Sequence, residues 1–136
     1  MKTLLFALFI AFGFCAQANA QNKPEPNWVV VSSGDKSTYA FDKTSLKRNG
    51  DIVSSWIKTT EEGKDGHTLD LTEMNCKTDQ MRILSSTIYY KNGTTYSPKL
   101  KQEWFYVVRA SIGETLLGYA CKNAPKQSFI DKIFSK

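Results

Sequence analysis

The sequence contains one histidine, His67, which is the first residue to weigh as a catalyst. Asp65 and Asp70 lie close to it in the chain, but no motif supplies a nucleophile that this histidine could activate. The alternative is that His67 is a polar loop residue without a catalytic role, which accounts for the same sequence pattern. The adjacent carboxylates Glu61 and Glu62 fall in a charged loop, whereas a general acid needs an apolar pocket to shift its pKa. The sequence therefore predicts a protein that is not an enzyme and needs no cofactor.

Three cysteines occur, Cys15, Cys76 and Cys121, and no two of them form a Cys-x-x-Cys pair. With a single histidine in the chain, this spacing argues against zinc binding and redox catalysis. Cys15 lies in an N-terminal segment that we expect to be removed. Two cysteines then remain, and an even number in an exported chain indicates one disulfide between them.

Residues 1–20 have the pattern of a secretory signal peptide. A basic start at Lys2 precedes an apolar run, and the small residues that end the segment fit a peptidase site, so we expect cleavage after Ala20. The apolar run is shorter than the roughly 20 residues of a transmembrane helix, so no transmembrane span is expected. The alternative is a lipid anchor on Cys15, but the bulky Phe14 beside this cysteine argues against it. The sequence thus predicts export to the periplasm, or secretion or display at the cell surface.

The chain that remains has the size of one domain. Cleavage after Ala20 leaves 116 of the 136 residues, which is too few for two domains. Without Lys2 the chain keeps 17 basic and 13 acidic residues, and its net charge falls from +5 to +4. The lysines are scattered, so a solvated basic surface explains them better than a site for an acidic polymer. Nucleic acid is not expected as a partner.

Most of this chain has the composition and turns of β-strands. Residues 21–27 carry two prolines and predict a flexible lead-in. The pairs Asn49-Gly50 and Asn92-Gly93 favour tight turns between strands. Residues 81–90 have apolar side chains in both parities, which is typical of a central strand. We expect strands at residues 28–33, 37–41, 52–60, 67–76, 81–90 and 103–108.

The segment 67–76 alternates less regularly than the others. Leu69 and Leu71 share one parity, whereas Met74 and Cys76 fall in the other. Either a bulge near Glu73 or a strand with apolar contacts on both faces would reconcile the two sets.

The period changes after the last strand. Ser111 and Glu114 form a capping box, and Ile112, Leu116 and Tyr119 follow at helical spacing. The sequence therefore predicts an α+β domain: a small antiparallel β-sheet with a C-terminal α-helix packed on it. The tail, residues 123–136, has the pattern of a short amphipathic helix with its apolar side at Phe129, Ile130, Ile133 and Phe134.

The stretch Tyr89–Trp104 is the best candidate for a binding surface. It interleaves aromatic residues with lysines, a combination suited to protein or glycan contacts. In the alternative interpretation, Tyr90 and Trp104 belong to the core and the lysines only keep a long loop soluble. The candidate binding residues are Tyr89, Lys91, Tyr96, Lys99 and Lys101.

Three segments resemble the surface-adhesin protein E-like domain family. YAFDKTSLKRNGDIVSSWIK has an aromatic strand that ends in Asp, a glycine turn and a strand with Trp. EMNCKTDQMRILSSTIYYKNG has a cysteine that closes one strand and an Arg-x-Leu in the next. EWFYVVRASIGETLLGYAC has a Trp, a Ser-x-x-Glu helix start and a closing cysteine. The resemblance covers residues 28–122 and implies the same antiparallel sheet, the C-terminal helix and a disulfide between Cys76 and Cys121.

The resemblance also sets the expected function. It implies an exported cell-envelope binding domain, adhesin-like, that contacts an extracellular-matrix or envelope protein or glycan without catalysis, and it leaves a dimer open. The alternative is a soluble periplasmic structural or accessory protein of the same fold with no adhesive role, since a fold does not by itself carry a function.

Overall fold

A computed structural model describes residues 24–34 and 36–126. The predicted signal peptide at 1–20, the first residues of the lead-in and tail residues 127–136 lie outside the described part of the chain. Residues 24–27 precede the first strand without regular structure. The elements are β1 (Trp28–Ser33), β2 (Ser37–Asp42), β3 (Lys47–Asn49), β4 (Ile52–Glu61), β5 (Gly66–Asn75), β6 (Gln80–Tyr90), β7 (Thr95–Tyr96), β8 (Phe105–Tyr106) and α1 (Ile112–Asn123).

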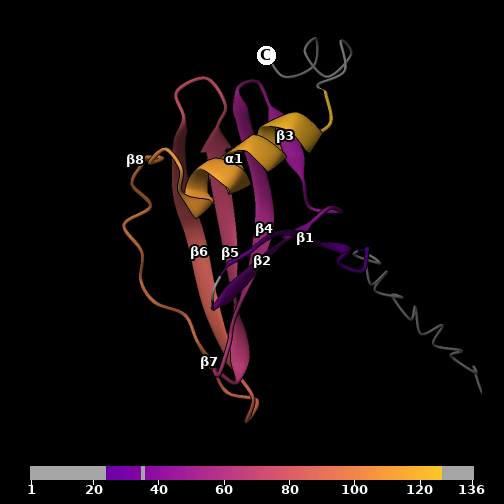
Figure 1. Ribbon diagram of the computed structural model, residues 1–136, viewed down its shortest axis with the longest axis vertical. Helices are drawn as coiled ribbons and strands as arrows, with labels where there is room; N and C mark the ends of the chain where they lie inside the picture. Colours follow the sequence, from indigo (N-terminus) through magenta and orange to yellow (C-terminus); the bar gives the residue numbers. More distant parts are fainter. Residues whose placement is uncertain (1–23, 35, 127–136) are drawn as a thin grey trace, which may run out of the picture.

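These strands form one antiparallel sheet with α1 on one face. The strand order is β1-β2-β4-β5-β6-β7, while β3 pairs with β4 and β8 pairs with β6. Figure 1 shows α1 crossing one end of the sheet, with the β4–β5 turn and β7 at the opposite end. Most strands pair with the next strand in the chain, because short turns join them into antiparallel hairpins.

The core lies between the helix and the sheet end that it covers. Phe41, Val53 and Met74 are fully buried on the sheet side. Leu116, Leu117 and Ala120 are buried on the helix side. A disulfide joins Cys76, just after β5, to Cys121 in α1, with 5.7 Å between the two Cα atoms. The predicted α+β class and the predicted disulfide are both confirmed.

The irregular alternation of residues 67–76 is explained by apolar contacts on both faces. Strand β5 pairs with β4 in unbroken register from Ile52↔Asn75 to Thr59↔Thr68, so β5 has no bulge near Glu73. Met74 faces the helix, and the half-buried Leu69 and Leu71 lie on the opposite face.

The bulge lies instead on β6. The register passes from Leu71↔Ser85 to Thr72↔Ile83, which leaves Leu84 without an opposite residue. Before the bulge the odd-numbered side chains of β6 face the helix side of the sheet, and after it the even-numbered ones do. Met81 and Ile88 therefore lie on the same face. As predicted, β6 lies inside the sheet with a neighbour on each side, but on its outer side only the two-residue strands β7 and β8 pair with it. The last strand, expected at 103–108, is reduced to Phe105–Tyr106.

The predicted tight turn and the predicted helix cap are both present, with a shift of one residue in the turn and in one hydrogen bond of the cap. The first tight turn is centred on Gly50 and Asp51, one residue later than expected, with Gly50 at φ +59°. At the start of α1, the Ser111 hydroxyl accepts a hydrogen bond from the Glu114 amide at 3.4 Å. The Glu114 carboxylate accepts from the Ala110 amide at 2.7 Å, one residue before the Ser111 amide that the reciprocal bond of a capping box would use.

Candidate functional site

The predicted binding tyrosines gather at the end of the sheet farthest from the helix. Tyr89, Tyr90 and Tyr96 are 37%, 45% and 56% exposed. They lie where β6 ends and β7 returns beside it, next to the start of β5 (Figure 1). We call these three tyrosines and His67 the tyrosine tip. Large aromatic side chains with this exposure offer contact area at low entropic cost, because each has two rotatable bonds.

The strand register sends the tyrosines to both sides of the sheet. His67 is opposite Tyr89, and their rings stack with centroids 4.9 Å apart and planes 7° apart. Tyr96 is opposite Ile88, one residue earlier on β6, so it lies on the other face from Tyr89. The tip therefore presents aromatic surface around the end of the sheet instead of a single flat platform.

A glycine makes the approach of the two strands possible. Gly66 has φ +125°, a conformation that favours glycine, and it is opposite Tyr90. A Cβ atom added to Gly66 would lie 2.0 Å from the Tyr89 carbonyl oxygen. Any larger residue would push β5 away from β6 at this point, and the His67–Tyr89 stack depends on that spacing.

A shallow hollow of about 400 Å³ adjoins the tip. One side is formed by Ile88, Tyr89 and Tyr90, and the other by the polar loop between β4 and β5. In that loop Lys64 pairs with Glu61, and Asp65 pairs with Lys91 at 3.5 Å, all of them exposed. The hollow thus combines aromatic rings with exposed charges of both signs, which suits polar partner groups beside apolar ones.

The predicted lysines are distributed differently from the tyrosines. Lys91 belongs to the turn between β6 and β7, so it lies at the tip. Lys99 and Lys101 are exposed in the connection that runs from β7 to β8 along the outer side of β6 (Figure 1). The structure brings Tyr89, Lys91 and Tyr96 together, while the other two lysines extend the basic surface along the sheet edge.

The alternative interpretation assigned Tyr90 and Trp104 to the core, but neither residue belongs to the buried core between the helix and the sheet. Trp104 is half-buried and lies under the Arg82 guanidinium, 4.6 Å from the ring centroid, so it has a packing role. Tyr90 is exposed and lines the hollow instead of the core. The sequence analysis did not predict that His67 stacks on Tyr89. The only feature of the sequence that pointed to it was the alternation that places His67 in a strand.

His67 and the carboxylates near it in sequence do not form a catalytic group. Asp70 is an odd number of residues from His67 on β5, so the two side chains lie on opposite faces. Asp65 pairs with Lys91. Burial raises the pKa of Asp70, against a smaller lowering by a hydrogen bond from Ser86. Within residues 24–34 and 36–126, no group of three or more His, Cys, Asp or Glu side chains could hold a metal ion.

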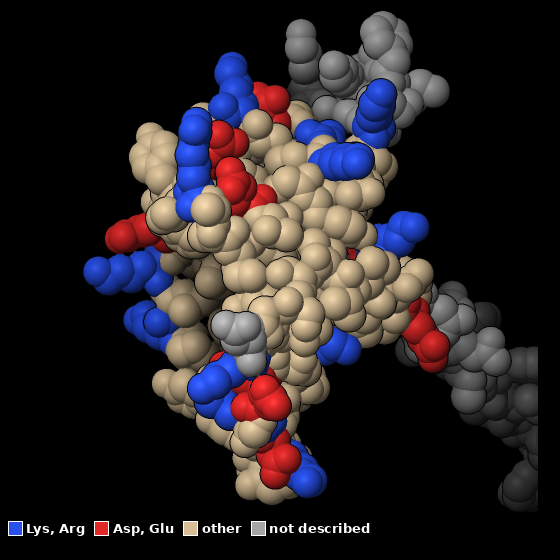
Figure 2. Space-filling model, in the orientation of Figure 1, with Lys and Arg blue, Asp and Glu red and all other residues tan. Residues whose placement is uncertain are grey.

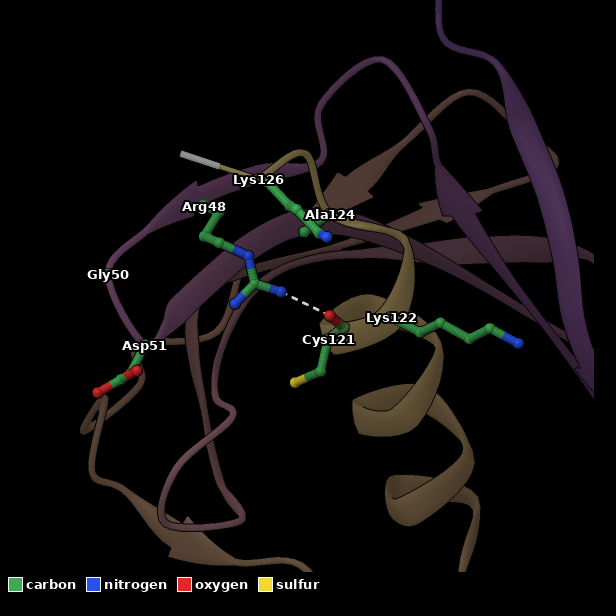
Figure 3. Close-up of a pocket in the computed structure, with 7 residues that line it drawn as sticks. All are labelled: Arg48, Gly50, Asp51, Cys121, Lys122, Ala124 and Lys126. Carbon is green, nitrogen blue, oxygen red and sulfur yellow. Dashed lines mark hydrogen bonds between the residues drawn. The ribbon is translucent and has the colours of Figure 1, made fainter. Parts of the chain in front are cut away.

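A second hollow, of about 390 Å³, lies at the C-terminal end of α1 (Figure 3). The Arg48 guanidinium reaches from β3 and donates to the Cys121 carbonyl, while Lys122 points away from it. A cation that binds a carbonyl in the last turn of a helix stabilises that turn. Arg48 therefore joins β3 to α1 and is a structural residue.

On the face that carries α1, the charged residues lie around the margin. In Figure 2 the middle of this face is mostly uncharged, and Lys, Arg, Asp and Glu lie above it, below it and at its sides. The lower group includes the loop charges that surround the tyrosine tip. No helix in the described part of the chain is long and apolar enough to cross a membrane.

The chain belongs to the Surface-adhesin protein E family, whose model matches residues 28–122. Comparison with curated proteins and with solved structures found no match. The match runs from the first residue of β1 into the last turn of α1, so it covers the whole sheet, the helix and the disulfide. Membership in this family indicates an adhesin-like surface protein, and it favours a binding role over catalysis.

Proposed function

We propose that this member of the family is an exported cell-envelope domain that binds a protein or glycan partner through the tyrosine tip, without catalysis. The observation that carries the proposal is the cluster of three exposed tyrosines at the end of the sheet that the helix leaves uncovered. Exposed aromatic clusters of this kind are enriched in binding surfaces and rare elsewhere on small domains.

The environment of the cluster supports recognition of a partner. The His67–Tyr89 stack fixes one ring pair, and the hydrogen bonds of the β6–β7 turn fix the backbone beneath Tyr90. A preformed surface loses little conformational entropy on binding. Lys91 at the tip and Lys99 and Lys101 along the adjoining sheet edge add positive charge, which would speed the approach of an acidic partner.

Export is part of the proposal. It rests on the signal-peptide pattern of residues 1–20 and on the disulfide, since disulfides persist in oxidising compartments. We expect a mature chain that begins at Gln21 and carries no acyl group. Intact-mass analysis of the secreted or periplasmic protein measures this, and a diacylated N-terminus at Cys15 would contradict it.

The binding proposal is tested by capture of partners from matrix and envelope extracts. The double variant Tyr89→Ser/Tyr96→Ser should lose most of the partner that the native protein retains, because it removes two apolar contacts. Val30→Ser is the matched control, since Val30 is exposed on β1 at the other edge of the sheet. Equal capture by all three folded proteins would exclude the tyrosine tip as the site.

A further inference from the structure

The hollow beside the tyrosine tip contains a gap in one row of side chains. Gly66 on β5 is opposite Tyr90 on β6. Continuing the register of β4 and β5 by two residues places Glu61 on the other side of Gly66. Because neighbouring strands lie about 5 Å apart, the backbones of β4 and β6 are about 10 Å apart at this row. Gly66 has no side chain, so its bare backbone forms the floor of a gap that is wide enough for a six-membered ring.

The next row of side chains supplies polar groups to the hollow. Thr59 on β4 is opposite Thr68 on β5, and Thr68 is opposite Ile88 on β6. Thr68 lies six residues before Met74 on the same strand, so this row is on the helix side of the sheet. Both threonines are half-buried, and neither hydroxyl makes a hydrogen bond with another described residue. Two hydroxyl groups that can donate and accept are therefore available to a ligand.

Charged groups complete the surroundings of the hollow. Glu61 pairs with Lys64, Asp65 pairs with Lys91 at 3.5 Å, and all four side chains are exposed. Exposed ion pairs are weak, so these groups can exchange their partners for groups of a ligand. A carboxylate accepts hydrogen bonds and a lysine donates them, so ligand hydroxyls would find both kinds of partner here.

We propose that the hollow binds a pyranose ring of a glycan. This inference rests on the proposed function, because it names the chemical class of partner that the tyrosine tip binds. A pyranose has an apolar C–H face and a rim of hydroxyl groups. Its C–H face packs on the Tyr90 ring, which is 45% exposed, since the electron-rich face of an aromatic ring attracts C–H groups. Its hydroxyls then lie against the Thr68 hydroxyl and the Glu61 carboxylate across the gap.

The size and charge of the hollow favour a glycan over a protein surface. Its volume of about 400 Å³ is in the range of pockets that hold small ligands through a few polar groups. A standard protein interface covers about 800 Å² on each partner and has few charged residues at its centre. Lys91 lies outside the lining of the hollow, where it can meet an acidic group further along the same glycan.

The test is capture of the partner from matrix and envelope extracts before and after mild periodate oxidation. Periodate cleaves the carbon–carbon bond between neighbouring hydroxyl groups, so it opens pyranose rings and leaves the polypeptide chain intact. The native protein should retain about tenfold less partner from the oxidised extract, because both the stacking and the hydrogen bonds are lost. Unchanged retention after oxidation overturns the glycan, and the partner is then a protein.

Two variants test whether the ring lies in this hollow. Thr68→Val keeps the shape of the side chain and removes one hydroxyl, so retention should fall about fivefold, as expected for one lost hydrogen bond. Tyr90→Leu keeps an apolar side chain and removes the flat ring, so retention should fall about tenfold. Thr60→Val is the matched control, because Thr60 is exposed on the other face of β4 and does not line the hollow. It should retain as much partner as the native protein.

The outcomes separate this inference from the proposed function. Tyr89→Ser/Tyr96→Ser should lose a protein or a glycan alike, whereas only a glycan is lost on oxidation. Thermal melts show which variants are folded. Retention that is sensitive to periodate but unchanged in folded Thr68→Val and Tyr90→Leu overturns the hollow as the glycan site. An equal loss in Thr60→Val overturns it too, because the effect is then not specific to the hollow.

Discussion

Asp70 is a residue whose charge works against the fold. It lies on β5 between Ile57 and Ser86, and its Oδ1 atom is buried without a hydrogen-bond partner in the described part of the chain. Burial raises its pKa above the ordinary value of 3.8, and a hydrogen bond from Ser86 opposes this in part. The charged form is therefore less favourable in the folded protein than in the unfolded chain.

The first prediction follows from the direction of that shift. Because the folded pKa is the higher one, the folded state is most stable below the ordinary value, and stability falls as pH rises through the folded pKa. Asp70→Asn should therefore raise Tm at pH 7 and change it little below about pH 3.5, where Asp is mostly protonated even when unfolded. Thermal melts at both pH values measure this. An equal gain at both would show that the buried charge is not the cause.

The second prediction concerns Gly66. Gly66→Ala places a Cβ 2.0 Å from the Tyr89 carbonyl oxygen at a positive φ, so we expect a loss of about 2 kcal/mol in the free energy of unfolding. Gly118→Ala is the control, because a Cβ on this exposed helical residue meets no atom within 4 Å. It should stabilise the protein by about 1 kcal/mol. Urea unfolding of both variants measures the difference, and a neutral Gly66→Ala would contradict the close approach.

The candidate site was predictable from sequence in part. Tyr89, Lys91 and Tyr96 lie close together along the chain, and a turn at Asn92-Gly93 is enough to place them at one end of a hairpin. The stack of His67 on Tyr89 joins two strands, and it depends on a register that local pattern does not specify. Their role as binding residues remains a prediction.

At the scale of elements, the disulfide fastens α1 to the sheet. Cys76 and Cys121 are 45 residues apart, and closing a loop of this length stabilises a fold by about 4 kcal/mol in the chain-entropy model. The helix needs this support because Gly113 and Gly118 each lower its intrinsic stability by roughly 1 kcal/mol relative to alanine.

The third prediction is that the double variant Cys76→Ala/Cys121→Ala loses about 4 kcal/mol, a large share of the stability of a small domain. Denaturant unfolding of the variant and of the native protein measures the loss. Alkylation of the native protein without reductant should leave both thiols unmodified. Two labelled cysteines in folded protein would refute the bridge.

The positions of the strands along the chain were predictable from alternation and turn residues. The pairing of each strand with its neighbours in the sheet was not. The bulge at Leu84 changes which β6 residues share a face, and nothing in the local sequence distinguishes it from two-sided burial. The segment 103–108 has the β-branched and aromatic composition of a full strand. Only two of its residues, Phe105 and Tyr106, pair as a strand, opposite Met81 and Gln80 at the start of β6.

At the scale of the whole molecule, the end of the sheet that the helix covers is separated from the end that we propose as the binding site. The helix, the disulfide and the core occupy one end of the sheet, and the tyrosine tip occupies the other (Figure 1). Substitutions at the tip should therefore change binding with little effect on folding. The lysines that extend from the tip along the sheet edge belong to the same surface.

The fourth prediction separates the role of charge from that of contact. Replacement of Lys91, Lys99 and Lys101 by Ser should slow association with an acidic partner and flatten its salt dependence, because exposed charges act on the encounter. Tyr96→Ser should instead speed dissociation, since it removes a contact of the bound state. Surface plasmon resonance on the captured partner measures both rates. Identical rates in both folded variants would remove this surface from the binding site.

The most direct test of the central claim is site-specific photo-cross-linking. A photo-reactive amino acid is placed at Tyr96, at the tyrosine tip, and in a second protein at Val30, which is also exposed but lies on β1. We predict that the partner captured from matrix or envelope extracts is cross-linked from position 96 and not from position 30. Cross-linking from position 30 alone, with none from position 96, would contradict the assignment of the tyrosine tip as the binding surface.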